Sequence, residues 1–225
     1  MQALLDAIAI DGPAGAGKST VAKVVAAELG FQYLDTGAMY RSAALVALRD
    51  GVGLEDEDAC GEIAQGMDVR FIPGNPQRVL LNGEDVTDAI RTVEVSNAAS
   101  TISVHPRVRK EMVRRQRALC EAGSVVLEGR DTTTVVCPDA RLKVFLTASI
   151  EERARRRLKD LQAAGEDVAL EAVLEQIRER DMRDTTRDHS PLRVAEGALV
   201  VDTDELSAEE VAGRIIEAWR SGTAS

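Results

Sequence analysis

A glycine-rich turn close to the amino end of the chain restricts the folds open to it. Residues 12–19 read Gly-Pro-Ala-Gly-Ala-Gly-Lys-Ser, and Thr20 follows. They match the pattern G-x-x-x-x-G-K-[ST], in which glycines let successive backbone N–H groups turn inward around phosphate oxygens. An apolar run at 7–10 precedes the turn, and a helical pattern that ends at Gly30 follows it. This order predicts the strand–loop–helix unit that opens a parallel α/β sheet.

The same turn predicts a site for the phosphates of a nucleoside triphosphate. The dipole of the following helix adds positive potential, and Lys18 reaches the β- and γ-phosphates. The Ser19 hydroxyl is the predicted ligand for Mg²⁺, the expected cofactor. The predicted ATP-binding residues in the turn are Gly12, Pro13, Ala14, Gly15, Ala16, Gly17, Lys18, Ser19 and Thr20.

Later apolar runs predict more of the same sheet. They lie at 125–127, 142–146 and 199–201. Helices are expected after the last two, because Ser149 with Glu152 and Ser207 with Glu210 have the spacing of capping boxes.

A hairpin interrupts this series of strands and helices. Apolar residues alternate on either side of the turn Pro73-Gly74-Asn75-Pro76. We predict an α/β P-loop kinase core at 1–60 and 105–225 and a small inserted antiparallel β subdomain at 61–104, which would bind the nucleoside monophosphate. The charged stretch within about 150–190 is predicted to be a helical lid.

Composition and charge narrow the possible partners. The 225 residues carry a net charge of −10, which argues against a nucleic acid polymer. The amino end lacks a signal-peptide pattern and the apolar runs are short, so we expect a cytoplasmic protein without a membrane partner. Cys60, Cys120 and Cys137 are expected to be reduced thiols.

Arginine clusters within this acidic chain favour a small anionic acceptor held in a cleft. The alternative is that these arginines have no role in binding and belong to solvated helix faces, because glutamates occur beside them at helical spacing. No N-K-x-D guanine-reading motif is present, which weakens a GTPase interpretation. A kinase for another acceptor, such as UMP or a small acid, and a P-loop ATPase or switch without an acceptor remain open.

Six further blocks bear on the acceptor. They are LDTGAMYR at 34–41, NAAS at 97–100, PRVR at 106–109, GRD at 129–131, RDMRD at 180–184 with Arg187, and PL at 191–192. In order and over nearly the whole chain, these blocks resemble those of bacterial cytidylate kinases. The resemblance implies a monomeric enzyme that transfers the γ-phosphoryl group of ATP to CMP or dCMP.

The resemblance also implies roles for individual residues. Ser100, Arg109 and Asp131 would face the cytosine, and Arg41, Arg130 and Arg187 would hold the monophosphate. Arg180 and Asp184 would lie near the sugar, Thr36 on the acceptor side, and Arg157 on the lid over the ATP phosphates. Lys18, Arg130 and Arg187 are the predicted catalytic residues.

Simpler interpretations of single residues remain open. Arg180 and Asp184 could form a surface pair four residues apart on a helix, and Asp35 or Thr36 could cap a helix.

The sequence departs from the family pattern G-R-D-[MI]-G-T at 132–134, which read Thr-Thr-Thr. Thr133 replaces a glycine, and we expect strain if this position needs a positive φ. No obvious Walker-B aspartate ends a strand, and Glu128 occupies the position where one is expected.

Overall fold

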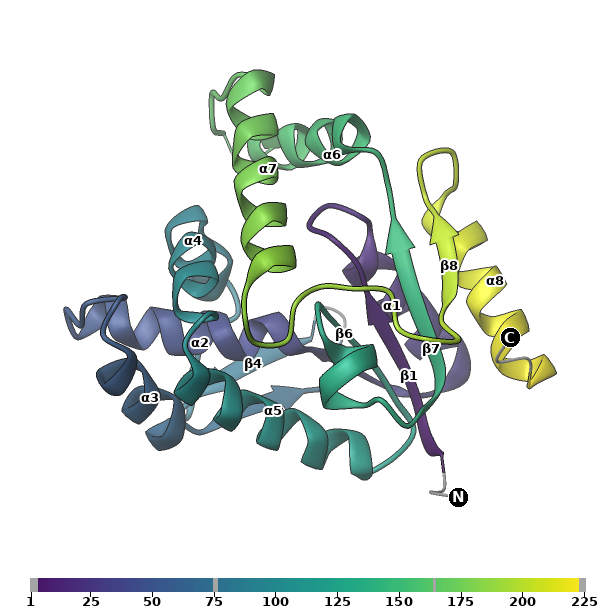
Figure 1. The fold of residues 1–225 in the computed structure, drawn as a ribbon, viewed down its shortest axis with the longest axis horizontal. Coiled ribbons are helices and arrows are strands. Elements are labelled where there is room, and N and C mark those ends of the chain that lie inside the picture. The colour runs from purple at the N-terminus through teal and green to yellow at the C-terminus, as the bar shows by residue number, and fades with distance from the viewer. Residues whose placement is uncertain (1–3, 75–76, 164, 223–225) are drawn as a thin grey trace.

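The computed structural model describes residues 4–74, 77–163 and 165–222. Its larger sheet has five parallel strands in the order β2-β6-β1-β7-β8 (Figure 1). The strands are β1 Leu5–Asp11, β2 Gln32–Asp35, β6 Val125–Gly129, β7 Ala140–Thr147 and β8 Leu199–Asp202. The predicted parallel sheet is confirmed, and the edge strand β2 was not predicted.

The central strand β1 is buried on both faces, because layers of helices cover the sheet on either side. Ile8 and Ile10 pack toward α1 (Lys18–Leu29) and α8 (Ala208–Ser221). Ala7 and Ala9 pack toward α5 (Pro106–Glu121) and the short π-helix η2 (Thr132–Val136). Strand periodicity of two sends alternate side chains to opposite faces, which produces this division.

The predicted helix ends are mostly confirmed. Gly30 ends α1 in the left-handed conformation, and Ser207 and Glu210 form a complete capping box at α8. At α6 (Ile150–Ala163) only half of the predicted box exists. The Ser149 hydroxyl accepts from the Glu152 backbone N–H, but the Ser149 backbone N–H donates to Asp204 instead of to Glu152.

The predicted hairpin is confirmed within a small antiparallel sheet. Its strands are β3 Val69–Ile72, β4 Arg78–Leu81 and β5 Glu84–Asp85. Asn75 and Pro76, at the predicted turn, lie outside the described residues. Helices pack around this sheet, namely α2 Thr36–Arg49, α3 Glu57–Gly66, the 3₁₀ turn η1 Ala89–Arg91 and α4 Val93–Ile102. The boundaries of a separate subdomain at 61–104 stay a prediction.

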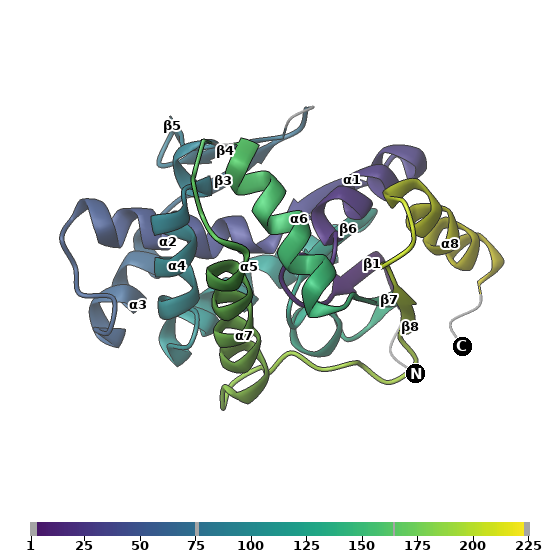
Figure 2. The ribbon, with the colours of Figure 1, turned by 90° about the horizontal axis from the view of Figure 1, so that it is seen from above.

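Helices α6 and α7 (Leu170–Thr186) stand beyond the carboxyl ends of β1 and β7, and the view from above shows them over the same edge of the sheet (Figures 1 and 2). They share a small apolar core of Ala154, Leu161, Val173 and Ile177. Val93 of α4 also packs against this core. The lid stays a prediction.

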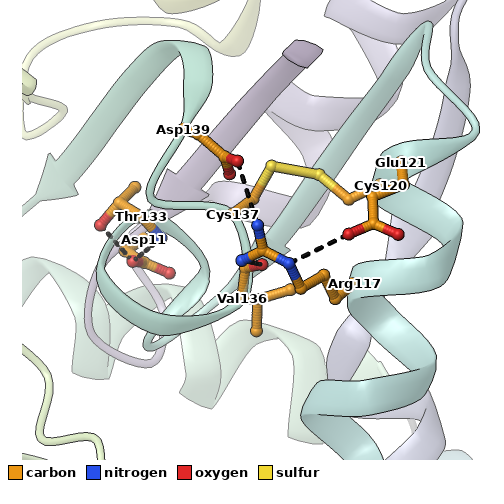
Figure 3. The surroundings of a disulfide bond; sticks show 8 residues. All are labelled: Asp11, Arg117, Cys120, Glu121, Thr133, Val136, Cys137 and Asp139. Carbon is orange, nitrogen blue, oxygen red and sulfur yellow. Dashed lines mark hydrogen bonds and ion pairs between the residues drawn. A yellow bond between two sulfur atoms is a disulfide. The ribbon is translucent and has the colours of Figure 1, made fainter. Parts of the chain in front are cut away.

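The prediction of three reduced cysteines is wrong. Cys120, near the end of α5, and Cys137, just after η2, form a disulfide, and Cys60 is free (Figure 3). Both partners are fully buried. The pairing depends on how α5 lies against the turn after β6, a tertiary contact that the spacing of the cysteines does not reveal.

No helix in the described part of the chain has the length and apolar character needed to cross a bilayer.

The disulfide leads to a direct test. In denaturant without reductant, a thiol reagent should label Cys60 only, and after reduction it should label all three cysteines. Because the bond closes a loop with a sequence separation of 17, Cys137→Ala should lower the free energy of unfolding by about 3 kcal/mol in the chain-entropy treatment. Cys60→Ala is the matched control for loss of a buried thiol. Labelling of three thiols before reduction would contradict the bond.

Candidate active site

The glycine-rich loop joins the end of β1 to the start of α1. Gly12, Gly15 and Gly17 have φ angles of 151°, 81° and 83°. A Cβ at Gly12 would lie 2.1 Å from the carbonyl oxygen of Leu146, and a Cβ at Gly15 would lie 3.2 Å from that of Arg153. Both the backbone conformation and the close packing therefore require glycine at positions 12 and 15.

Lys18 begins α1, and its side chain lies back along the loop. Its Nζ donates to the carbonyl oxygen of Pro13 at 2.7 Å, and the residue is buried. Burial lowers the pKa of Lys18 to about 7, and the charges of Arg130 and Arg180 act in the same direction while Glu128 opposes them. An anion placed among these three cations would relieve their repulsion.

Glu128 is buried near the carboxyl end of β6, where a Walker-B residue was expected. The Tyr33 hydroxyl donates to Glu128 Oε1 at 2.7 Å. Burial raises the pKa of Tyr33, and the Ser19 side chain is near enough to act against that effect. The predicted metal ligand Ser19 is thereby linked to Glu128 through Tyr33. No sequence pattern pointed to Tyr33, because it lies on β2, a strand that was not predicted.

The donor set around Ser19 fits Mg²⁺. Among the described residues, no group of three or more histidine, cysteine, aspartate or glutamate side chains gathers at one point. Mg²⁺ is usually held by one or two protein oxygens together with substrate phosphates and waters, and it does not need a full protein cage. An exposed hydroxyl at Ser19 beside a buried carboxylate meets that requirement.

Two arginines of α6 bind the loop backbone. Arg153 Nη1 donates to the carbonyl oxygen of Ala14 at 3.2 Å, and Arg156 Nη1 to that of Gly15 at 3.5 Å. Arg153 also forms a two-bond ion pair with Asp181 of α7, at 3.1 and 2.7 Å. Arg153 thus joins α6 and α7 to the loop. The sequence did not distinguish this role of Arg153 from that of the neighbouring arginines.

The predicted acceptor-side residues come together from four elements. Arg41 of α2 pairs with Asp35 at 2.7 Å, and Arg109 of α5 pairs with Asp131 just after β6. Arg109 also lies 5.7 Å from the centre of the Tyr40 ring. These contacts place two guanidinium groups beside two carboxylates in a buried region.

Asp184 of α7 joins the remaining arginines. It accepts from Arg130 Nε at 2.9 Å and lies 3.7 Å from Arg187 Nη1. Burial opposes its ionisation, but the charges of Arg130, Arg180 and Arg187 outweigh this effect and lower the pKa of Asp184. Asp184 is 7% exposed, so the interpretation of Asp184 and Arg180 as a surface pair is wrong.

Unpartnered donors concentrate at the same place. Seven buried side-chain polar atoms lack a partner in the described part of the chain, and five belong to this cluster: Tyr40 Oη, Arg41 Nε, Arg109 Nε, Arg180 Nε and Arg187 Nη2. Burial, followed by the charge of Arg130, lowers the pKa of Arg180 to about 10. Buried donors are normally satisfied. Their grouping beside a surplus of arginines over carboxylates indicates a binding site for an anion rich in acceptors.

Three predicted residues have contacts of other kinds. The Thr36 hydroxyl donates to the carbonyl oxygen of Glu128 at 2.6 Å, while Asp35 caps α2. Ser100 accepts from Arg183 at 3.1 Å, which ties α4 to α7. The Arg157 side chain has no hydrogen bond or ion pair with any described residue, but its charge acts on Arg180.

The expected strain at Thr133 is absent. Thr133 is not among the non-glycine residues with positive φ. Its backbone N–H and its hydroxyl donate to Asp11 Oδ2 at 2.8 and 2.6 Å. The expectation failed because this turn does not use the left-handed conformation, and the side chain gains a buried partner.

The comparisons with known proteins decide the family. The family model for cytidylate kinase matches residues 8–221. The chain belongs to the cytidylate kinase family. The resemblance seen in the sequence blocks is thereby confirmed, and the chain is a member of an enzyme family of kinases.

Curated cytidylate kinases are similar over almost their whole length. That of Caldanaerobacter subterraneus subsp. tengcongensis is 51% identical over 216 residues, covering 96% of this chain and 95% of the relative. That of Bacillus subtilis is 51% identical over 212 residues, covering 94% and 95%. A solved structure of an uncharacterised protein from Eubacterium ventriosum has a TM-score of 0.54 at 14% identity, covering 96% of this chain and 98% of that chain, and supports the fold alone.

The charge cluster of this cytidylate kinase family member predicts how stability depends on pH. Because the pKa of Asp184 is below its usual 3.8, its contribution is present above about pH 4 and is lost as the pH falls through the folded pKa. Asp184→Asn should lower the free energy of unfolding by about 3 kcal/mol at pH 7, because buried arginines lose their partner. The difference from wild type should narrow below pH 3.8.

Denaturant unfolding of both proteins between pH 3 and pH 7 measures this difference. Glu175→Gln is the control, since Glu175 forms an exposed ion pair with Arg178 on the same helix. It should leave stability near wild type at each pH. A difference for Asp184→Asn that is small, or that stays constant down to pH 3, would contradict the assigned ion pairs.

Proposed function

We propose that this enzyme transfers the γ-phosphoryl group of ATP to CMP or dCMP, giving ADP and CDP or dCDP, with Mg²⁺. The observation that carries the proposal is the group of buried, unpartnered arginine donors beside a P-loop. A loop that binds the phosphates of ATP is common to many ATPases. A kinase whose acceptor is also a phosphate needs a second set of cations for that acceptor. The full-length similarity to cytidylate kinases supports the same acceptor.

On the donor side, the loop backbone at 12–17 and the start of α1 hold the triphosphate. Lys18 supplies a charge to the transferring group, and Ser19 and Thr20 lie exposed at the first turn of α1. Mg²⁺ would supply positive charge that neutralises the phosphate oxygens of ATP. In this chain Ser19 would hold it, with Glu128 acting through Tyr33 or through a bound water.

On the acceptor side, Arg41, Arg130 and Arg187 hold the monophosphate. Arg41 Nε and Arg187 Nη2 are unpartnered donors, and a guanidinium fork suits phosphate oxygens. Arg130 lies close enough to Lys18 to lower the pKa of that lysine. The two cations therefore border the reacting region, Lys18 on the side of ATP and Arg130 on the side of the monophosphate. Each cation is attracted to the negative charge that develops on the phosphoryl group between them, and this attraction offsets their mutual repulsion.

The nucleoside is read by the neighbouring polar groups. The Asp131 carboxylate can accept from the N4 amino group of cytosine, and Arg109 can donate to its O2 or N3. The carboxylate of Asp184 can accept from a sugar hydroxyl, and Arg180 brings a free Nε to the same place. Ser100 and Thr36 belong to this acceptor set.

Water exclusion is assigned to the lid within about 150–190. Arg153 and Arg156 hold α6 against the loop, which leaves Arg157 without a partner among the described residues and free to reach the ATP phosphates. An inserted monophosphate-binding subdomain at 61–104, a monomeric state, a cytoplasmic location and the lack of a nucleic acid partner complete the proposal.

One coupled assay tests the function. ADP release is measured with ATP and Mg²⁺ in the presence of CMP, dCMP, UMP, AMP or shikimate, and without an acceptor. We expect turnover with CMP and dCMP. Preference for UMP or shikimate would favour another small-molecule kinase, and acceptor-independent release would favour an ATPase or switch. Lys18→Ala should reduce kcat on the order of 10³-fold while the circular dichroism spectrum stays native.

The lid arginines give a matched pair. Arg157→Ala should raise the KM for ATP, or lower kcat, by about tenfold, because it removes a charged donor to phosphate. Arg155→Ala should leave both constants near wild type, since Arg155 is exposed and pairs with Glu152 on its own helix. Steady-state kinetics at fixed CMP measures both variants. Equal effects, or none from Arg157→Ala, would argue against its role.

A further inference from the structure

Asp11 is a buried carboxylate with an unusual set of donors. It is fully buried at the end of β1. The backbone N–H and hydroxyl of Thr132 donate to Oδ1 at 2.9 and 2.7 Å, and those of Thr133 donate to Oδ2 at 2.8 and 2.6 Å. All four bonds come from two successive residues, so the carboxylate fixes this short stretch of backbone from two directions.

The position of this contact joins the two halves of the site. Asp11 directly precedes Gly12 of the phosphate loop, and Thr132 directly follows Asp131, which pairs with Arg109. The orientation of the Asp131 carboxylate therefore depends on backbone that Asp11 holds. The Asp11 carboxylate already accepts four hydrogen bonds from within the chain, so its role is structural.

The hydroxyl of Thr133 is the part of this contact that the backbone cannot supply. Any residue except proline at 133 would offer the N–H, but a glycine, as in the family pattern, would offer no hydroxyl. Burial raises the pKa of Asp11, and the bonds from Thr133 and Thr132 act against that effect. Each hydroxyl bond thus helps to keep a carboxylate charged in a fully buried position.

The far end of the same turn is held independently. Cys137 follows η2 and is bonded to Cys120, and Arg117 donates to the carbonyl oxygen of Val136 and to Asp139 (Figure 3). With that end fixed covalently, loss of one hydroxyl at Thr133 should loosen the end next to Asp131 while the rest of the turn stays in place.

We propose that Thr133 is a positioning residue for recognition of the acceptor base. Its hydroxyl, bonded to Asp11, keeps Asp131 aligned with Arg109, so that the pair presents its carboxylate and guanidinium to cytosine together. The inference rests on the proposed function and deepens it, because it names a residue outside direct contact with substrate that sets base selectivity.

Three variants test this role. Thr133→Val removes the hydroxyl at nearly constant volume, and Thr133→Ser keeps it. Thr134→Val is the matched control, because the Thr134 hydroxyl on the next residue is buried without a partner in the described part of the chain. KM and kcat are measured for CMP and for ATP, and kcat/KM is compared between CMP and UMP.

We expect Thr133→Val to raise the KM for CMP on the order of tenfold, the effect of losing a hydrogen bond to a charged group. The KM for ATP should stay within about twofold of wild type, and the preference for CMP over UMP should fall by a similar factor to the change in KM. Thr133→Ser should restore the wild-type values, and Thr134→Val should match wild type throughout.

The outcomes separate this inference from the proposed function. A Thr133→Val enzyme with a lower melting temperature but unchanged KM for CMP and unchanged base preference would overturn the positioning role alone. Equal changes in Thr133→Val and Thr134→Val would do the same. A wild-type enzyme with no turnover of CMP or dCMP would overturn both proposals.

Discussion

The ion pair between Arg130 and Asp184 connects the end of β6 to α7 across the candidate site. Around it, arginines from α2, α5 and α7 approach one another in a region with little solvent. Without carboxylates among them, the repulsion between the arginines would open the site. Removing unpaired guanidinium charges from water would also cost free energy. Asp184, together with Asp35 and Asp131, therefore allows several cations to gather where an anionic substrate can use them. The N–H groups that remain unpartnered are available to donate hydrogen bonds to that substrate.

The parallel sheet determines where this gathering occurs. Asp11, Asp35 and Glu128 all lie at or near the carboxyl ends of neighbouring strands, which meet at one edge. The phosphate loop leaves the central strand at the same edge, and α6 and α7 cross above it (Figure 1). Ligands of open α/β sheets bind at this edge because the loops there come from different strands. Donor and acceptor residues distant in sequence are neighbours for that reason.

Predictions from sequence succeeded where local pattern and local structure coincide. The strand at 7–10, the glycine loop, the hairpin and the capping box at Ser207 depend on residues close in the chain, and all of them are confirmed. The ordered blocks also indicated the right family, as the family model and the relatives show. The structure brings together Arg41, Arg109, Arg130, Asp131, Asp184 and Arg187, and their roles stay a proposal. Predictions failed where a distant partner decides. Thr133 was expected to strain its turn, yet it donates to Asp11, and the Ser149 backbone N–H donates to Asp204 instead of to Glu152 of the predicted capping box.

The sequence by itself therefore determined the phosphate loop, the α/β class and the residue types available for an anionic acceptor, because these follow from spacing and side-chain chemistry. Only the tertiary structure decided which arginine pairs with which carboxylate and which donors remain unpartnered. It also decided that Cys120 bonds to Cys137 and that Tyr33 lies between Ser19 and Glu128. Each of these depends on how strands and helices pack, and packing brings together residues that no local pattern relates.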